Sequence, residues 1–155
     1  MFEIRRADHS DSQTAFDIRL LAIRHQCINA YTETQLLAWT AGAASDGYYT
    51  LMEKHFYLGC IDGEPVATGM LDLENSEIGA IFVHPDFMQR GIGRRVLDHL
   101  ESLARELGLE EVKLDATLNA ADFYRRYGFV GEEPAIYHSP SGLQLACVPM
   151  VKGLL

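Results

Sequence analysis

Apolar positions recur along the chain with two different spacings, and each spacing predicts one kind of secondary structure. From Ile92 to Leu107 they return every three or four residues, which indicates one face of a long helix that Gly108 ends. The same spacing predicts further helices at about Ser12–Ala30, through Leu36, Leu37 and Trp39, at Tyr48–Lys54 and at Asn119–Tyr127. Runs of β-branched and aromatic residues predict strands at Phe2–Arg6, His55–Ile61, Pro65–Leu73, Ile78–Val83, Glu111–Ala116, Phe129–Tyr137 and Leu143–Val151.

Turn and capping residues mark the ends of these elements. Asp62-Gly63, between two predicted strands, is a strong hairpin signal. Thr32 with Gln35 predicts a capping box, and Asn119 is the expected cap of the last helix. The stretches Gly42–Gly47 and Ser139–Gly142 are expected to be loops. The order of strands and helices then predicts an α+β fold with a mixed sheet.

Composition narrows the class of protein. With 155 residues the chain is expected to form one domain, residues 1–155, that needs no metal or disulfide to stabilise its core. A formal net charge of −9 argues against nucleic acid as a partner and suits a cationic substrate such as an amine. The three cysteines are widely spaced and form no zinc motif, which favours a reducing, cytoplasmic setting. No apolar run approaches the roughly 18 residues of a membrane span, so no membrane association is expected.

A glycine-rich turn between the strand at Ile78–Val83 and the long helix predicts an anion site. The first N–H groups of a helix have no partner and carry the positive end of the helix dipole. Arg90, Arg94 and Arg95 add positive charge around Gly91 and Gly93, so we expect a phosphate or pyrophosphate ligand here. The alternative is a plain strand–turn–helix whose glycines serve tight packing. A dinucleotide fingerprint needs a third glycine where Val96 stands, and no nucleotide P-loop string is present.

Two stretches resemble the landmarks of the GNAT family of acyl-CoA N-acyltransferases. Met88-Gln89-Arg90-Gly91-Ile92-Gly93 is similar to the family's pyrophosphate loop, although Met88 replaces the usual Gln or Arg. Asn119 to Phe129, with Phe123-Tyr124 and a closing Gly-Phe, resembles the family's second landmark. The resemblance extends from about Phe2 to Lys152 and implies the GNAT fold, in which a central pair of strands splays apart. It also implies acetyl-CoA as cosubstrate, bound by Ile81, Phe82, Val83, Gln89, Arg90, Gly91, Ile92, Gly93, Arg94, Arg95 and Asn119.

Acyl transfer to an amine needs a polarised carbonyl, a base for the amine and a proton donor for the leaving thiolate. The resemblance assigns the first task to backbone N–H groups at Ile81–Val83 and the third to Tyr124 as general acid. Glu77 is the candidate base, because strand alternation predicts that it shares a face with Gly79, Ile81 and Val83. Its alternatives are a chain of water molecules or one of Asp72, Glu74, His84 and His138, of which His84 is expected to cap the turn.

Other aromatic and polar residues have weaker assignments. Phe123 and Tyr127 are expected to be an i,i+4 pair in the core. The resemblance builds the acceptor pocket from the first two helices and the last hairpin, where Arg24, His25, Tyr31 and Trp39 are candidates, with a core role as the alternative for the two aromatics.

The sequence as a whole predicts direct transfer of an acetyl group from acetyl-CoA to a primary amine of a small molecule or peptide. The alternative is a CoA-binding sensor or interaction module without turnover. The oligomeric state stays open, with a homodimer as one possibility.

Overall fold

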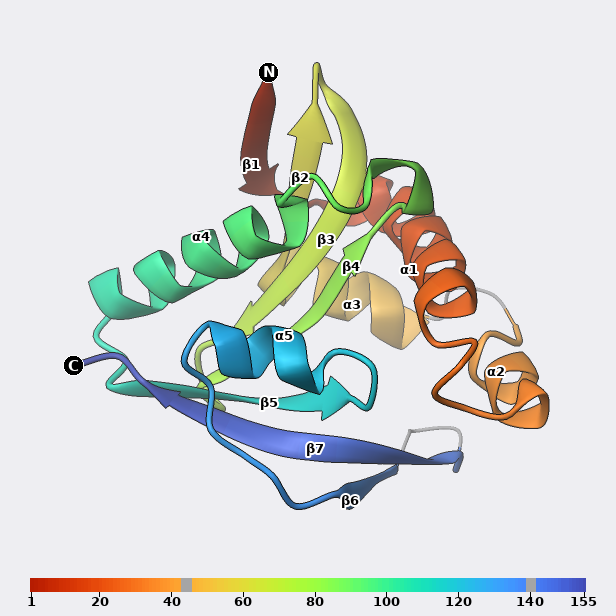
Figure 1. Ribbon diagram of the computed structural model, residues 1–155. Helices are drawn as coiled ribbons and strands as arrows, with labels where there is room; N and C mark the ends of the chain where they lie inside the picture. The colour runs from red at the N-terminus through yellow and green to blue at the C-terminus, as the bar shows by residue number, and fades with distance from the viewer. Residues whose placement is uncertain (43–45, 139–141) are drawn as a thin grey trace.

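A seven-stranded mixed sheet runs through the centre of the molecule (Figure 1). The structure is a computed structural model, and it describes residues 1–42, 46–138 and 142–155. The strands lie in the order β1-β2-β3-β4-β5-β7-β6, and β4 with β5 is the parallel pair in an otherwise antiparallel sheet. This confirms the expected α+β class. The strands are β1 (Phe2–Arg6), β2 (Phe56–Ile61), β3 (Glu64–Asp72), β4 (Glu77–Val83), β5 (Glu111–Thr117), β6 (Ala135–His138) and β7 (Gln144–Gly153).

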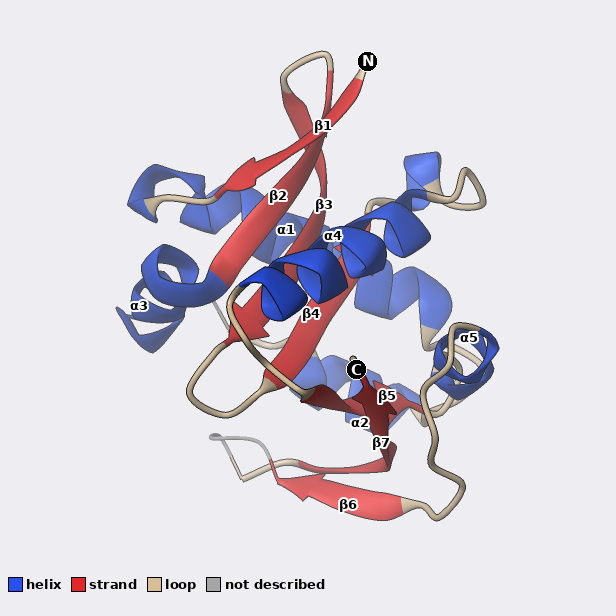
Figure 2. Ribbon diagram, turned by 90° about the vertical axis from the view of Figure 1, so that its left-hand side faces the viewer, coloured by secondary structure: helices blue, strands red, loops and turns tan. Residues whose placement is uncertain are grey.

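The helices form a layer on each face of the sheet (Figure 2). On one face α4 (Ile92–Glu106) and α5 (Ala121–Arg126) share an apolar core with β3, β4, β5 and β7. On the other face lie α1 (Ser12–Gln26), α2 (Glu33–Trp39) and α3 (Asp46–His55), with two smaller apolar clusters beneath them. Short 3₁₀ turns occupy His9–Asp11 and Pro85–Phe87. None of the helices in the described part of the chain has the length and apolar character needed to span a bilayer.

Gly69 allows α4 to lie directly on β3. A Cβ atom at this position would approach Val96 Cγ1 to 2.6 Å and Leu100 Cδ1 to 3.0 Å, far inside normal contact distance. The missing side chain therefore sets how closely the helix and the sheet can pack, and with it the position of the loop that precedes α4.

Local signals in the sequence located most element ends. The Thr32–Gln35 capping box is confirmed, because Thr32 Oγ1 accepts from Gln35 N at 3.1 Å and Gln35 Oε1 accepts from Thr32 N at 3.0 Å. Asp62 and Gly63, with φ of 50° and 85°, form the tight β2–β3 turn. Gly108, with φ of 88°, follows the end of α4 as expected. Residues 43–45 and 139–141 of the two expected loops lie outside the described residues.

Three of the boundaries that differ from expectation have a clear local cause. The helix predicted to reach Ala30 ends at Gln26, and Cys27 N closes it by donating to Ile23 O. Asn119 does not cap α5, because a turn in which Ala120 N donates to Thr117 O delays the helix to Ala121. The strand expected from Phe129 is short, since Val130 makes only an isolated bridge and regular pairing begins at Ala135.

Candidate active site

The two parallel strands at the middle of the sheet diverge. Glu77 of β4 pairs with Lys113 of β5, and Lys113 N donates to Ser76 O at 2.9 Å. Among the described residues this is the single ladder pair between β4 and β5, and the strands then separate (Figure 1). The edge of β4 that faces β5 is therefore open beyond Glu77.

A bulge in β4 changes which side chains face which layer. Ala80 has φ of 50°, and the β3–β4 register shifts between Thr68 and Met70, so β4 holds one residue more than β3 here. Thr68 Oγ1 donates to Ala80 O at 2.7 Å and holds the bulge in place. After the bulge, Ile81 and Val83 pack on the α4 side with Ile78, whereas Phe82 packs on the α1 side.

The predicted common face of Glu77, Gly79, Ile81 and Val83 is thus wrong beyond Gly79. Simple alternation holds only in a regular strand, and the extra residue reverses it.

The same ladder fixes the direction of the N–H groups on β4. His84 N donates to Val66 O at 2.8 Å, and hydrogen-bonded pairs alternate along an antiparallel ladder. The N–H of Val83 therefore points away from β3 and into the opening, while that of Phe82 points towards Thr68. Of the Ile81–Val83 segment, Val83 is the residue whose N–H this alternation directs into the opening.

The loop before α4 presents backbone donors. Gly91 is the N-cap of α4 with φ of 76°, a left-handed conformation that glycine adopts without strain. The first helical bond runs from Arg95 N to Gly91 O at 3.1 Å, so the N–H groups of Ile92, Gly93 and Arg94 have no acceptor within the helix. Gly91 has no side-chain capping bond, and a Cβ atom there would meet nothing within 4 Å. The glycine is required by its backbone conformation rather than by crowding.

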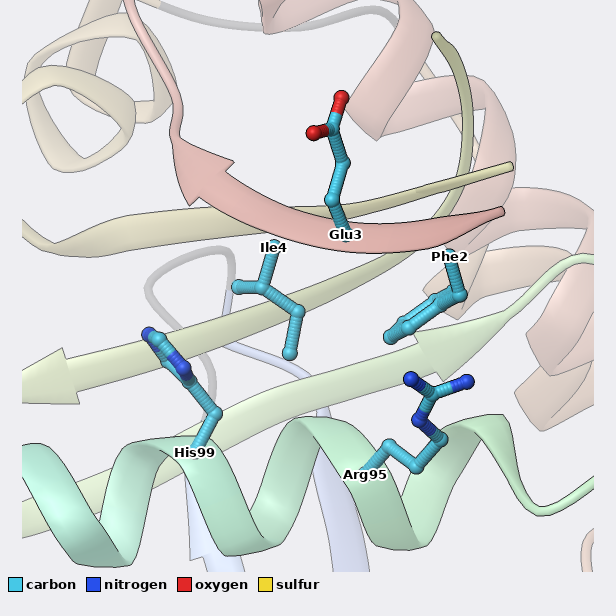
Figure 3. Close-up of a pocket in the computed structure, with 5 residues that line it drawn as sticks. All are labelled: Phe2, Glu3, Ile4, Arg95 and His99. Atoms are coloured by element: carbon cyan, nitrogen blue, oxygen red, sulfur yellow. The ribbon is translucent and has the colours of Figure 1, made fainter. Parts of the chain in front are cut away.

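The three arginines of this region do not all stay at the loop. The Arg90 guanidinium lies 5.2 Å from the centre of the Phe87 ring, and that of Arg94 lies 4.9 Å from the centre of the Tyr127 ring. Arg95 instead lies 4.3 Å from the Phe2 ring centre. It lines a hollow of about 250 Å³ between α4 and β1, together with Phe2, Glu3, Ile4 and His99 (Figure 3). The structure therefore separates Arg95 from Arg90 and Arg94.

Tyr124 lies on α5, whose neighbouring residues Phe123 and Tyr127 approach Gly93 and Arg94 at the start of α4. Its ring is 8% exposed and packs edge-on against Phe123 at 5.2 Å and Phe129 at 5.7 Å between ring centres. Burial raises the pKa of the phenol to about 12, so it is protonated at neutral pH. The hydroxyl has no hydrogen-bond partner within the described part of the chain. Phe123 and Tyr127 form the expected i,i+4 pair, with ring centres 5.0 Å apart.

Glu77 is half-buried where β4 and β5 part. It lines a hollow of about 150 Å³ with Lys113, Leu114, Asp115, Pro149 and Met150. Burial raises the pKa of its carboxyl, and the nearby Asp115 carboxylate raises it further, while Lys113 acts in the opposite sense. A raised pKa brings a carboxylate closer to that of an efficient general base at neutral pH.

Asp72 and His84, two of the alternatives to Glu77 as the base, make hydrogen bonds that stabilise turns. Asp72 accepts from the backbone N–H groups of Glu74 and Asn75 and from Asn75 Nδ2, and these bonds lower its pKa. His84 caps the turn as expected, because its Nδ1 accepts from Asp86 N at 3.1 Å. Glu77 is therefore the carboxylate of this group that lines a hollow at the strand opening.

Of the four residues expected to line the acceptor pocket, two are aromatic residues that pack against each other and two are exposed on α1. Tyr31 is buried, and its hydroxyl donates to Ala146 O at 2.6 Å and accepts from Leu118 N at 3.1 Å, which ties the segment between α1 and α2 to β7 and to the residue after β5. Trp39 packs edge-on against it, with ring centres 5.5 Å apart. Arg24 and His25 are exposed on α1. Asn119 is exposed, and its side chain lies at the Cys27 thiol.

Sequence reasoning missed four residues on the α1 side of the opening: Arg19, Tyr48, Asp115 and Tyr137. Burial is the main cause that raises the pKa of the Tyr137 phenol. The charge of Arg19 lowers this pKa, and the carboxylates of Glu77 and Asp115 raise it. The one available signal was Arg19, a cation in the middle of an apolar helix stripe. No cluster of three or more potential metal-binding side chains occurs among the residues described.

Comparison with known proteins identifies the family and the fold of the chain. Residues 24–129 match the family described as Acetyltransferase (GNAT) family. The chain is 27% identical to the uncharacterized N-acetyltransferase YafP of Escherichia coli K12, covering 82% of this chain and 80% of YafP. It is 28% identical to the peptidyl-lysine N-acetyltransferase YjaB of Salmonella typhimurium, over 83% of each chain. A crystal structure of a GCN5-related N-acetyltransferase from Rhodopseudomonas palustris superposes with a TM-score of 0.88 at 26% identity, covering 97% of this chain and 94% of that one.

Proposed function

The chain belongs to the acetyltransferase (GNAT) family, and we propose that it moves the acetyl group of acetyl-CoA directly to a primary amine of a small molecule or peptide. The observation that carries this proposal is the opening between β4 and β5, which has Glu77 at its closed end and a free Val83 N–H along its edge. The donor-rich start of α4 is joined to β4 by one short connection that contains the 3₁₀ turn, so phosphate and thioester can be held by neighbouring segments of the chain.

The backbone of the α4 N-terminus is suited to the pyrophosphate of acetyl-CoA. Three N–H groups and the positive end of the helix dipole lie at one point, and Arg90 and Arg94 flank it. Gln89 and Ile92 belong to the same cradle through their backbone. Asn119, before α5, is proposed as a ligand of the pantetheine arm. The cosubstrate supplies an acyl group activated as a thioester; the remaining tasks belong to the protein.

Polarising the carbonyl and accepting the amine proton fall to two parts of β4. The Val83 N–H can donate to the oxygen that becomes an oxyanion in the tetrahedral intermediate. An alkylammonium with a reference pKa of about 10.4 must lose a proton before it can attack. Glu77, whose pKa is raised by burial and by Asp115, is the proposed base for that proton.

Tyr124 is the proposed general acid, the proton donor for the leaving thiolate. Its pKa of about 12 lies above the reference value of about 8.5 for a thiol, so complete transfer would be uphill by about 5 kcal/mol. A hydrogen bond to the sulfur as negative charge develops requires no such transfer and is strongest in the transition state. The free hydroxyl and the surrounding apolar packing favour this role.

The test is release of free thiol from acetyl-CoA over a panel of primary amines, with products identified by mass. We expect thiol release that depends on the amine and a product heavier by one acetyl group. Calorimetry with CoA measures binding independently of turnover. Tight CoA binding with no acetyl transfer to any amine would favour the alternative, a CoA-binding sensor.

A further inference from the structure

Helix α1 carries a cation on its core-facing side. Ala15, Phe16, Ala22 and Ile23 are buried, and Arg19 occupies the middle of the stripe that they form at helical spacing. The helix packs against β3 and β4 (Figure 1), so this stripe faces the sheet. The guanidinium lies 5.6 Å from the centre of the Phe16 ring.

Arg19 has no acidic partner within ion-pair distance among the residues that the structure describes. Burial lowers the pKa of the guanidinium, which reports the unfavourable loss of water around the charge. A partly buried charge without a counterion is costly, so its presence in an apolar stripe calls for an anionic partner from outside the chain.

The surroundings of Arg19 connect it with the proposed base. Tyr48 of α3 packs on Phe16, with ring centres 5.2 Å apart, and forms one wall. Helix α1, which carries Arg19, packs on β4, the strand that carries Glu77, and the charges of Arg19, Glu77 and Asp115 all act on the pKa of the Tyr137 phenol of β6. Glu77 pairs with Lys113, and Asp115 is two residues further along β5 on the same face. Negative charge thus lies at the strand opening and positive charge at α1.

We propose that the acceptor is a small amine that also carries a carboxylate, with its amine facing Glu77 and Asp115 and its carboxylate bound by Arg19. This inference rests on the proposed acetyl transfer and names the substrate class of that same site. Arginine is suited to the task because its planar fork donates two parallel hydrogen bonds to a carboxylate. Arg19 is then a residue that determines specificity.

The arrangement also argues against other amines. A polyamine would bring a second cation towards Arg19, where it would be repelled. The side chain of a lysine within a protein carries no carboxylate near its amine, so it would leave Arg19 unpaired. A site built to bind a charged group discriminates strongly against a ligand that lacks it, because the buried group then loses its partner.

The experiment compares each acceptor with its own primary amide, which keeps the amine and removes the anionic charge. The panel consists of the common amino acids, β-alanine and 4-aminobutyrate, together with a lysine peptide whose ends are blocked. We expect kcat/KM for the best amino acid to exceed that for its amide at least tenfold. Arg19→Gln should raise KM for the amino acid at least tenfold, change kcat little and leave the amide unaffected.

Arg6→Gln is the matched control, because it removes the same charge from an exposed position on β1, at the far edge of the sheet. It should leave both substrates unchanged. Equal activity on acid and amide, equal losses for both in Arg19→Gln, or better activity on the blocked peptide would overturn the proposal. Calorimetry of the same acid and amide pairs with CoA-loaded protein measures binding of the acceptor without turnover. A lack of turnover alone therefore contradicts the proposed acetyl transfer and not the proposed substrate class. Equal affinity for acid and amide in that measurement overturns the substrate class.

Discussion

Tyr124 combines a buried ring with a hydroxyl that has no hydrogen-bond partner in the described part of the chain. Tyr124→Phe keeps the ring and its contacts with Phe123 and Phe129 and removes only the hydroxyl. Turnover should fall roughly tenfold or more, with acetyl-CoA affinity and Tm nearly unchanged, because the bond acts mainly in the transition state. Steady-state kinetics beside calorimetry and a thermal melt measures these effects. Tyr57→Phe, which removes a hydroxyl on β2, is the control.

The leaving group provides a second check on Tyr124. A more acidic thiol leaves with less help, so the loss in Tyr124→Phe should shrink for such thioesters where chemistry limits the rate. Full activity of the variant under these conditions would remove Tyr124 from the chemistry and leave its ring a packing role.

The raised pKa of Tyr124 also makes a stability prediction. Above pH 10 the phenol ionises in the unfolded chain, whereas in the native protein it stays protonated up to about pH 12. The native state then binds more protons, so the free energy of unfolding falls as pH rises through this range. Urea unfolding at pH 8 and pH 11 should show a smaller alkaline loss in Tyr124→Phe than in the wild type. Equal losses would mean that the phenol ionises freely in the folded protein.

Two substitutions test Glu77 as the base: one removes its carboxylate, and the other lowers its pKa. Glu77→Gln should lower turnover by roughly 10²–10⁴, with partial rescue at high pH where free amine is abundant. Asp115→Asn removes a neighbouring negative charge that raises the pKa of Glu77. Because the base works only when ionised, activity is lost as pH falls through that pKa, and Asp115→Asn should move this acid limb to lower pH. A loss under threefold in Glu77→Gln at all pH values would transfer the role to water.

At the scale of single elements, the start of α4 depends on one backbone conformation. Gly91 has φ of 76°, which costs a side-chain-bearing residue roughly 1–2 kcal/mol, although Asn and Asp tolerate it best. Gly91→Asp should therefore fold, but its charge opposes the phosphates and CoA affinity should fall at least tenfold, about 1.4 kcal/mol. Gly91→Asn, of equal size and neutral, should retain most of the affinity by calorimetry. Unchanged binding in Gly91→Asp would exclude this loop from the site.

At the scale of the whole molecule, a buried ion pair joins α4 to the end of the chain. Glu101 of α4 is 3% exposed and contacts the Lys152 ammonium of β7, which also donates to Tyr127 O at 2.7 Å at the end of α5. Lys152→Met would leave the buried Glu101 carboxylate with only the Arg105 guanidinium, 3.9 Å away, so we expect a loss of up to about 3 kcal/mol. The double variant Glu101→Met with Lys152→Met should recover most of that loss in denaturant unfolding. A double variant less stable than the single one would show that the pair itself stabilises the fold.

Much of the fold followed from the sequence because its signals are local. The three-and-four spacing of Val96, Leu97 and Leu100 specifies a helix face, and the Asp62-Gly63 and Thr32–Gln35 pairs specify a turn and a cap within four residues. The glycine turn before a helix likewise specifies backbone donors for an anion. These features depend on neighbours along the chain, so one sequence is enough to read them. The family resemblance rested on the same local motifs.

Only the tertiary structure decided which of these residues share a site. The bulge at Ala80 depends on how β4 registers with β3, and it reversed the faces of Ile81 and Val83. The Arg95 guanidinium lies over the Phe2 ring of β1, and the charge of Arg19 on α1 acts on the phenol of Tyr137 on β6, although these segments are far apart in the sequence. Strand register and long-range packing depend on the whole sheet, whereas the spacing of residues within one segment does not. Which residues share a site depends on register and long-range packing, so the sequence pattern alone could not decide it.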